Sequence, residues 1–300
     1  MRPSDVSALT HYGGREFAGR LSPLLDARPA RAWCAVNVPG MASIDRSVRF
    51  LLPYLVRSSV RQTMPWGLLG LTLGGSLVKE FAPLPDSYLN NKRNLLNICF
   101  VKFAWAWTFI LLLPFISITN YLVTRNILVV FQRLTTLMVG TAVWYACTCV
   151  FLYIEDLTGT CYKSPALDIQ LLEHLNKLQC QKAGHFWHGF DISGHSFLLS
   201  YCALMIVEEM AVMHSVTTSQ GSRLHRAVSI LFLALSCLTL IWLLMFLTTA
   251  IYFHDFFQKF FGTLVGLFAW YGTYRFWYLK PVSPGLPPQR TSFQKSNHSL

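Results

Sequence analysis

Two histidines are the side chains best suited to chemistry in this chain of 300 residues. His195 belongs to a Ser-Gly-His tripeptide that starts at Ser193, and His254 lies between two long apolar runs. One imidazole can attack phosphorus and become a phosphohistidine, while a second protonates the leaving oxygen. The pair therefore predicts phosphoryl transfer with no metal and no cofactor. Alternatively, both are interfacial histidines whose nitrogens bond to lipid headgroups and water.

Further residues could bind such a substrate. The charge on phosphoryl oxygens requires cationic or N–H partners, and the apolar residues that follow His195 could hold an acyl chain. A second interpretation stays open, because lysines and arginines at helix ends reach toward headgroups and apolar residues face lipid. The substrate-binding candidates are Ser193, Gly194, Lys92, Arg93, Lys102, Phe197, Leu198 and Leu199.

The elements that carry these residues are predicted to be membrane-spanning helices. Hydrophobic residues make up 53% of the chain and charged residues only 13%, whereas soluble domains carry about 25% charged residues. Apolar runs that approach the roughly 20 residues needed to cross a bilayer are 65–78, 99–118, 134–154, 196–213, 227–252 and 256–274. We therefore expect an all-α polytopic membrane protein with a six-helix transmembrane bundle.

The sequence outside the membrane domain, residues 65–278, divides into three parts. Residues 1–40 are expected to be a disordered N-terminal extension, and residues 279–300 a disordered cytosolic tail. Residues 41–64 combine an apolar stripe with arginines, which predicts a basic amphipathic segment on a membrane surface, broken at Pro53. The formal net charge of +11 lies mostly in loops and tails, so nucleic-acid binding is not expected.

The distribution of basic residues predicts which side of the membrane each loop faces. Arginines without acids occupy the loops after the second and fourth runs, whereas the loop 155–191 is net acidic. The positive-inside rule then places both termini in the cytosol and both histidines on the lumenal side, although the mildly basic loop 79–97 argues against this. Because a secretory lumen is oxidising, Cys161 and Cys180 are a candidate disulfide, with two reduced cysteines as the alternative.

Two other groups of residues have weaker functional readings. His185 and His188 flank Trp187 and suit a metal only with further ligands, and an aromatic belt is the competing interpretation. Glu208 and Glu209 lie within the fourth apolar run. They could line the polar path of a transporter, or pair with cations inside the bundle.

Several longer segments carry a resemblance to a known family. They are 185–197, which contains the Ser-Gly-His tripeptide, and 83–89, 91–94, 104–109 and 270–274. These segments resemble the fat storage-inducing transmembrane proteins, and most of all the second, broadly expressed member of that family. The resemblance runs from Met41 to Pro288 and so covers most of the chain.

The resemblance implies a multi-pass protein of the endoplasmic reticulum that supports lipid-droplet biogenesis and lipid homeostasis. It implies a fatty acyl-CoA diphosphatase that releases acyl 4'-phosphopantetheine and adenosine 3',5'-bisphosphate. It also implies binding of diacylglycerol and triacylglycerol. The competing function is therefore a non-catalytic protein that binds neutral lipid and partitions it into droplets.

The same family is related to the lipid phosphate phosphatases. His195 and His254 match the catalytic pair of those enzymes, and by analogy His254 is the nucleophile and His195 the acid. Gln258 stands where their third motif has an aspartate, and their first, cationic motif is not evident. The group that orients the nucleophile and the cations that hold phosphate are therefore left open.

Overall fold

The computed structural model describes residues 40–82, 85, 87–91, 93–163, 170–172 and 176–288. The chain divides into two units, Met1–Val36 and Asn37–Leu300, and the description below concerns the second. Apart from Gly40, the predicted N-terminal extension lies outside the described residues.

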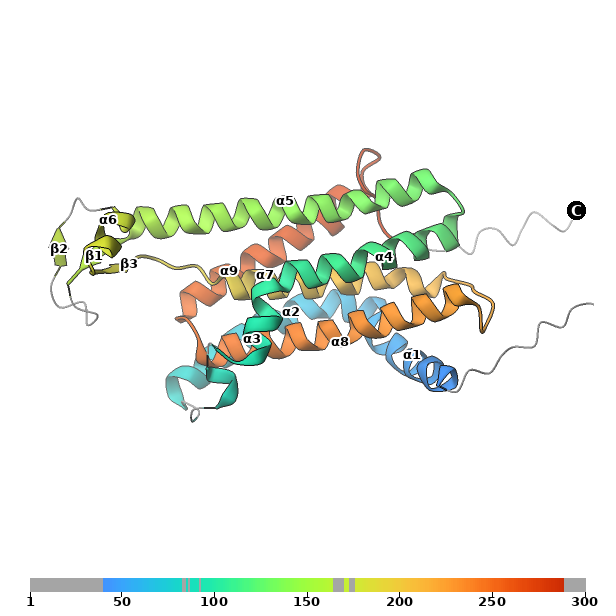
Figure 1. Cartoon of the computed structure of the whole chain (residues 1–300), viewed down its shortest axis with the longest axis horizontal. Coiled ribbons are helices and arrows are strands. Elements are labelled where there is room, and N and C mark those ends of the chain that lie inside the picture. The colour runs from blue at the N-terminus through green and yellow to red at the C-terminus, as the bar shows by residue number, and fades with distance from the viewer. Residues whose placement is uncertain are drawn as a thin grey trace, which may run out of the picture. The chain divides into compact units, whose positions relative to one another are not determined.

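The second unit is built almost entirely of helices, which confirms the all-α class (Figure 1). The long helices are α1 (Met41–Leu55), α2 (Ser58–Phe81), α4 (Ala104–Thr124), α5 (Ile127–Thr158), α7 (Gly194–Met210), α8 (Arg223–Tyr252) and α9 (Phe256–Trp270). Shorter pieces are α3 (Leu95–Cys99), α6 (Lys177–Lys182) and 3-10 turns at Tyr88–Asn90, Val101–Phe103, Ala211–His214 and Trp277–Leu279, with a π-helix at Tyr271–Phe276. Strands β1 (Thr160–Tyr162), β2 (Gln170–Leu172) and β3 (Phe186–His188) form one antiparallel sheet in the order β2-β1-β3.

Four helical segments of the described chain are long and apolar enough to cross a membrane: Val101–Thr124, Ile127–Thr158, Gly194–His214 and Arg223–Tyr252. They coincide with the second to fifth predicted runs, so the protein is a multi-pass membrane protein. The first and sixth predicted runs form α2 and α9, which are not among those four. Helix α2 starts at Ser58, and Pro53 lies inside α1. The expected break at Pro53 therefore occurs at Val56–Arg57 instead, and the predicted boundary at residue 65 falls inside a helix.

Helix α7 is the central element of the bundle. It packs against α9, α8 and α4. In its most apolar stretch 89% of the residues are buried, whereas in that of α5 only 17% are. Its approach to α9 depends on two glycines of α9. A Cβ on Gly262 would lie 2.4 Å from the carbonyl oxygen of Ser193, and one on Gly266 would lie 2.2 Å from Oγ of Ser200. Small residues let helices in a membrane approach this closely, so α9 is held against the start of α7.

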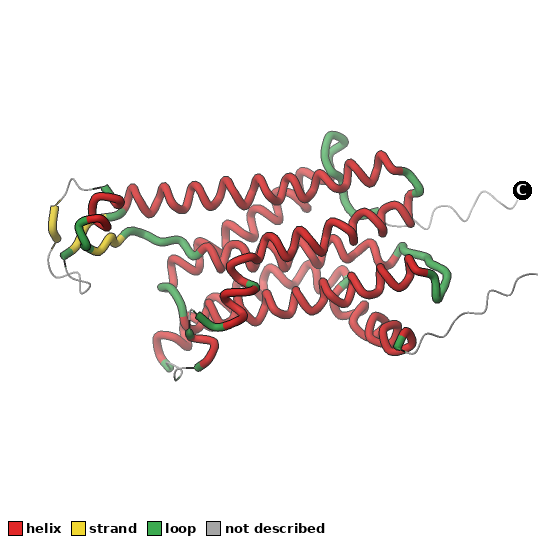
Figure 2. The backbone as a smooth tube through the Cα atoms, in the orientation of Figure 1, coloured by secondary structure: helices red, strands yellow, loops and turns green. Residues whose placement is uncertain are grey.

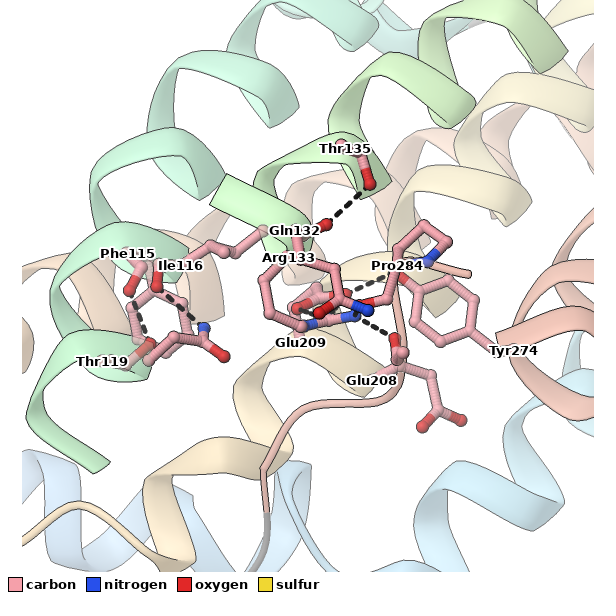
Figure 3. A network of polar contacts seen from close by, with 12 residues as sticks. Phe115, Ile116, Thr119, Gln132, Arg133, Thr135, Glu208, Glu209, Tyr274 and Pro284 are labelled. Carbon is pink, nitrogen blue, oxygen red and sulfur yellow. Dashed lines mark hydrogen bonds and ion pairs between the residues drawn. The ribbon is translucent and has the colours of Figure 1, made fainter. Parts of the chain in front are cut away.

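Ion pairs fix the opposite ends of the same helices (Figure 3). Arg133 Nη2 donates to both carboxylate oxygens of Glu209, at 2.7 and 2.6 Å, and the Tyr274 hydroxyl donates to Oε1 of Glu209 at 2.7 Å. Glu208 accepts from Arg61 Nη1 at 3.0 Å and from Arg275 Nη2. Both carboxylates are thus paired within the bundle. This removes the basis of the transporter hypothesis, which needed them on a polar path.

The chain after α9 folds back onto this network. Gln132 Nε2 donates to the carbonyl of Ser283 at 2.7 Å, and Arg133 Nη1 donates to the carbonyls of Pro284, at 3.3 Å, and Gly285. The buried Nη1 needs these acceptors because Glu209 is bonded to Nη2 and not to Nη1. The expectation of a disordered tail from residue 279 is therefore wrong up to residue 288, and residues 289–300 lie outside the described chain.

A small cap follows α5, which extends toward it (Figure 1). The cap contains the three strands, α6 and a Cys161–Cys180 disulfide, which is the pairing that the sequence suggested. Lys177 of α6 lies 2.8 Å from Oε2 of Glu155 at the end of α5. The hydrogen bond to Glu155 raises the pKa of Lys177. A loop runs from the cap to the start of α7 (Figure 2).

Candidate active site

The Ser-Gly-His tripeptide forms the start of α7. Ser193 is the N-cap, and its Oγ accepts from the Ser196 backbone N–H at 3.3 Å and from Ser196 Oγ at 3.0 Å. A serine cap satisfies an amide that the first helical turn leaves unpaired. Gly194 and His195 are therefore the first two helical residues, where the positive end of the helix dipole favours an anion.

His254 stands at the start of α9, in the tight connection after α8. Asp255 caps α9 in a capping box with Gln258. His254 itself has a φ of 53°, a left-handed conformation that is uncommon for a residue with a side chain. Lys79 of α2 holds this turn, because its Nζ donates to the His254 carbonyl at 2.5 Å and lies 3.5 Å from Oδ1 of Asp255.

The two histidine-bearing helix starts are bonded to each other. The backbone N–H of Ser193 donates to the carbonyl of Gln258 at 3.1 Å. Since His195 is two residues from Ser193 and His254 is four from Gln258, both imidazoles lie at the same end of the bundle. The predicted topology already placed both histidines at one end of the bundle.

Asp191 lies near both histidine sites and was not predicted as a functional residue. Its Oδ2 lies 3.8 Å from Nδ1 of His254, and its side chain lines the same cavity as His195. The carboxylate can stabilise a positive charge on either imidazole. Its position in the sequence could have indicated this role, because Asp191 is an acid two residues before the Ser-Gly-His tripeptide.

Gln258 fixes the proton on His254. The Gln258 side-chain oxygen is 3.2 Å from the backbone N–H of Asp255 and 3.1 Å from Nδ1 of His254. A backbone N–H only donates, so the glutamine atom facing it must be the oxygen and not the amide nitrogen. The oxygen in turn can only accept from Nδ1 of His254. The neutral imidazole therefore carries its proton on Nδ1 and its free lone pair on Nε2.

A cavity of about 290 Å³ opens beside His195. Its polar lining consists of the side chains of Lys102, Thr148, Glu155, Asp191 and His195, together with the helix start at Gly194. Of the predicted cations, the structure thus brings Lys102 to the site. Arg93 is an exposed turn residue whose backbone N–H donates to Asn91 Oδ1, and it does not line this cavity. Lys92 lies outside the described residues.

The apolar side of this cavity contains the three residues that were expected to hold an acyl chain. Phe197, Leu198 and Leu199 all line it. Phe197 is 1% exposed and packs between the rings of Phe151 and Tyr201, with centroids 5.4 and 6.2 Å away. Much of its surface is therefore used for packing within the bundle.

The remaining histidine candidates lie elsewhere. His188 is in β3, and its ring contacts that of Tyr162 in β1, with centroids 6.4 Å apart. Neither His185 nor His188 lines the cavity beside His195. Within the ranges that the structure describes, no three His, Cys, Asp or Glu side chains are grouped so that they could hold a metal ion.

The fold and the site define a class: a multi-pass, all-α membrane protein with two histidines and an acid at one end of its bundle. The family described as "Fat storage-inducing transmembrane protein" matches residues 85–234 and 217–274. The chain belongs to this family, which confirms the resemblance seen in the sequence.

Individual relatives agree with the family match. The chain is 60% identical over 252 residues to a mouse protein named acyl-coenzyme A diphosphatase FITM2, covering 84% of this chain and 96% of the relative. It is 58% identical over 259 residues to the human protein of that name, covering 86% and 99%. Mouse fat storage-inducing transmembrane protein 1 is 38% identical over 233 residues, covering 72% and 78%. No solved structure matches the chain.

Proposed function

We propose that the protein is a fatty acyl-CoA diphosphatase, the activity for which its FITM2 relatives are named. The observation that carries the proposal is His254, which Gln258 and Asp191 orient at the same helix-bundle end as His195. The substrate is a fatty acyl-CoA, and the bond cleaved is the phosphoric anhydride of its CoA part. The products are acyl 4'-phosphopantetheine and adenosine 3',5'-bisphosphate.

The reaction has two steps. Nε2 of His254 attacks one phosphorus of the diphosphate, and the bond from that phosphorus to the bridging oxygen breaks. His195 donates a proton to the departing oxygen, so that the phosphate-ester leaving group separates from the phosphohistidine with one less negative charge. Water, deprotonated by His195, then attacks the same phosphorus, the P–N bond breaks, and His254 returns to its neutral form.

Positive groups around the cavity stabilise the negative charge that develops on the phosphoryl oxygens. Lys102 supplies an ammonium group, and the start of α7 at Gly194 supplies backbone N–H groups. Ser193 acts indirectly, since its Oγ is engaged in capping α7. Asp191 holds the imidazolium of His254 in place during attack.

The proposed setting is the membrane of the endoplasmic reticulum, with the histidines facing the lumen. The basic loops and the Cys161–Cys180 disulfide support this orientation. Helices α2 and α9 would be the first and sixth spans, which places both termini in the cytosol. We also propose that the bundle resembles that of the lipid phosphate phosphatases. The protein is further proposed to support lipid-droplet biogenesis.

A second candidate function is binding of diacylglycerol or triacylglycerol without catalysis. It is favoured by an apolar cleft of about 510 Å³ between α2 and α9, lined with Trp66, Leu69, Leu264 and Phe268. This cleft lies away from the His195 cavity and shares no residue with it. Both functions can therefore coexist in one molecule.

The test is mass spectrometry of purified protein in detergent with oleoyl-CoA. Wild type is compared with His195→Ala, His254→Ala and, as a matched control, His185→Ala, which lies on the same side but outside the cavity. We expect adenosine 3',5'-bisphosphate from wild type and His185→Ala only. No product from folded wild type, together with retained triacylglycerol binding, would favour the second function. Full activity of either catalytic variant would refute the assigned pair.

A further inference from the structure

The cavity beside His195 is too small for the substrate that the proposed function requires. Its volume of about 290 Å³ lies just below the range of about 300–1,000 Å³ found for pockets that enclose drug-sized ligands. A fatty acyl-CoA carries a nucleotide, a pantetheine arm and a long acyl chain. The cavity has no room for the whole molecule, so the acylated arm must lie elsewhere.

A larger cleft adjoins the other histidine. It has a volume of about 620 Å³ and lies between the end of α2 and the start of α9. We call it the α2–α9 groove and define it by Leu73, Leu77, Phe81, Phe257, Lys79 and Lys259, all of which line it. It is distinct from the apolar cleft at Trp66 and shares no residue with it.

The groove is apolar along its α2 side. Leu73, Leu77 and Phe81 are spaced four residues apart, so their side chains form a stripe along one face of α2. They are 45%, 57% and 80% exposed. The stripe starts at the turn that contains His254 and runs along α2 toward the middle of the membrane domain. With α2 as the proposed first span, an acyl chain that lies on this stripe remains in the hydrocarbon part of the bilayer.

The groove carries charged side chains of both signs where it meets the active site. Lys79 Nζ donates to the carbonyl of His254 at 2.5 Å, which joins the groove to the turn that carries this histidine. Lys259 is 1% exposed and donates to the carbonyl of Ala250 at 2.7 Å. Two acids also line this end. Asp255 caps α9 and lies 3.5 Å from Lys79, and Glu80 is an exposed residue.

We propose that the α2–α9 groove holds the acylated pantetheine arm of the substrate, while the diphosphate lies at His254. The inference rests on the proposed function and deepens it. Lys79 then faces the phosphate-bearing end of the arm, and the α2 stripe contacts the acyl chain. The groove retains acyl 4'-phosphopantetheine after cleavage, whereas the nucleotide product leaves on the side of the His195 cavity.

Photocrosslinking locates the arm without any need for turnover. The probe is a palmitoyl-CoA analogue with a methylene-bridged, non-hydrolysable diphosphate and a diazirine in the acyl chain, bound to the full-length wild-type protein in nanodiscs. We expect crosslinked peptides that contain 73–81 and Phe257, and we expect excess oleoyl-CoA to displace them. Crosslinks at Trp144 or Leu198 instead would place the chain in the His195 cavity and overturn the inference. Groove crosslinks that oleoyl-CoA does not displace would indicate ordinary bilayer lipid and overturn it as well.

A substitution that fills the groove provides an independent measurement. Leu77→Trp is expected to raise the KM for oleoyl-CoA about tenfold while the KM for butyryl-CoA changes less than about twofold. The matched control is Leu240→Trp, at a residue of α8 that is 54% exposed and outside the groove, and it should change neither value. Equal effects on both substrates, or none, would count against the groove.

The two proposals can fail separately. If wild type does not hydrolyse acyl-CoA but the displaceable groove crosslinks appear, the groove is an acyl-CoA site and the proposed enzyme function is wrong. If hydrolysis occurs and the crosslinks map to the His195 cavity, the enzyme function stands and the inference is wrong.

Discussion

Nδ1 of His254 and the side-chain oxygen of Gln258 lie 3.1 Å apart, and the same oxygen is 3.2 Å from the backbone N–H of Asp255. The capping of α9 and the tautomer of His254 therefore depend on one glutamine. In lipid phosphate phosphatases the resemblance placed an aspartate at this position. A neutral acceptor can orient the imidazole equally well, although it does not add negative charge.

Replacement of Gln258 should change the rate and the pH profile of the reaction. Gln258→Leu removes the acceptor, and we expect kcat to fall about 10- to 100-fold with little change in KM, as for other groups that orient a reacting ligand. Gln258→Glu keeps an acceptor and should retain more activity. Its carboxylate stabilises the protonated imidazole, which cannot attack phosphorus, so the acidic limb of the kcat profile should move to higher pH. A Leu variant with wild-type kcat would contradict this role.

Asp191→Asn should slow the attack by His254. The substitution removes a negative charge 3.8 Å from His254 Nδ1. We expect kcat/KM to fall about tenfold because the positive charge that forms on His254 during attack loses its partner. Asp156→Asn, at the end of α5, is the control and should leave kcat/KM unchanged. Equal kcat/KM values for wild type and Asp191→Asn would argue against the contact.

Gly262→Ala tests whether the close packing of α7 and α9 sets the site geometry. The added Cβ would lie 2.4 Å from the carbonyl oxygen of Ser193, so one of the helices must move. Because Ser193 immediately precedes the start of α7, we expect a loss of activity of about 10-fold or more, since small displacements of reacting groups are costly. Gly272→Ala, where a Cβ meets no atom within 4 Å, should be neutral. Hydrolysis rates and melting temperatures of both variants provide the comparison.

Breaking the Arg133–Glu209 pair should destabilise the protein without a direct effect on chemistry. The side chains are 2% and 1% exposed, and removal of one partner leaves a buried charge uncompensated, at a cost of about 3–5 kcal/mol. Arg133→Leu and Glu209→Leu should therefore each lower the melting temperature in detergent. The double variant should be less destabilised than the sum of the two single variants. Additive losses would mean that the two side chains act independently.

The sequence predicted the membrane class and six apolar runs, four of which form the long apolar helices, and it predicted that the two histidines belong to one end of the bundle. These features follow from hydropathy and charge distribution, which act over tens of residues. Asp191, Gln258 and Lys79 were not predicted as site residues, because their roles depend on contacts between segments that are distant in the chain or on the local geometry of one turn. Lys79 is an example, since its partner His254 is 175 residues away.

The expected interruption at Pro53 and the expected disordered tail failed for a related reason. Pro53 lies inside α1 without ending it. The helix ends at Leu55, and the break between α1 and α2 is at Val56–Arg57. The residues after α9 look like a tail in composition because they are rich in proline and polar groups. Their carbonyls nevertheless bond to Gln132 and Arg133, and such acceptors cannot be read from the side chains of the tail itself.

The Cys161–Cys180 bond encloses residues 162–179 in a covalent ring. A protease that nicks the chain once inside this ring does not separate the two halves of the protein. On a denaturing gel without reductant the nicked chain stays in one piece, and with reductant it divides into two fragments of similar size. A protease site engineered into the ring thus reports both the oxidation state of the loop and the compartment in which the cut took place.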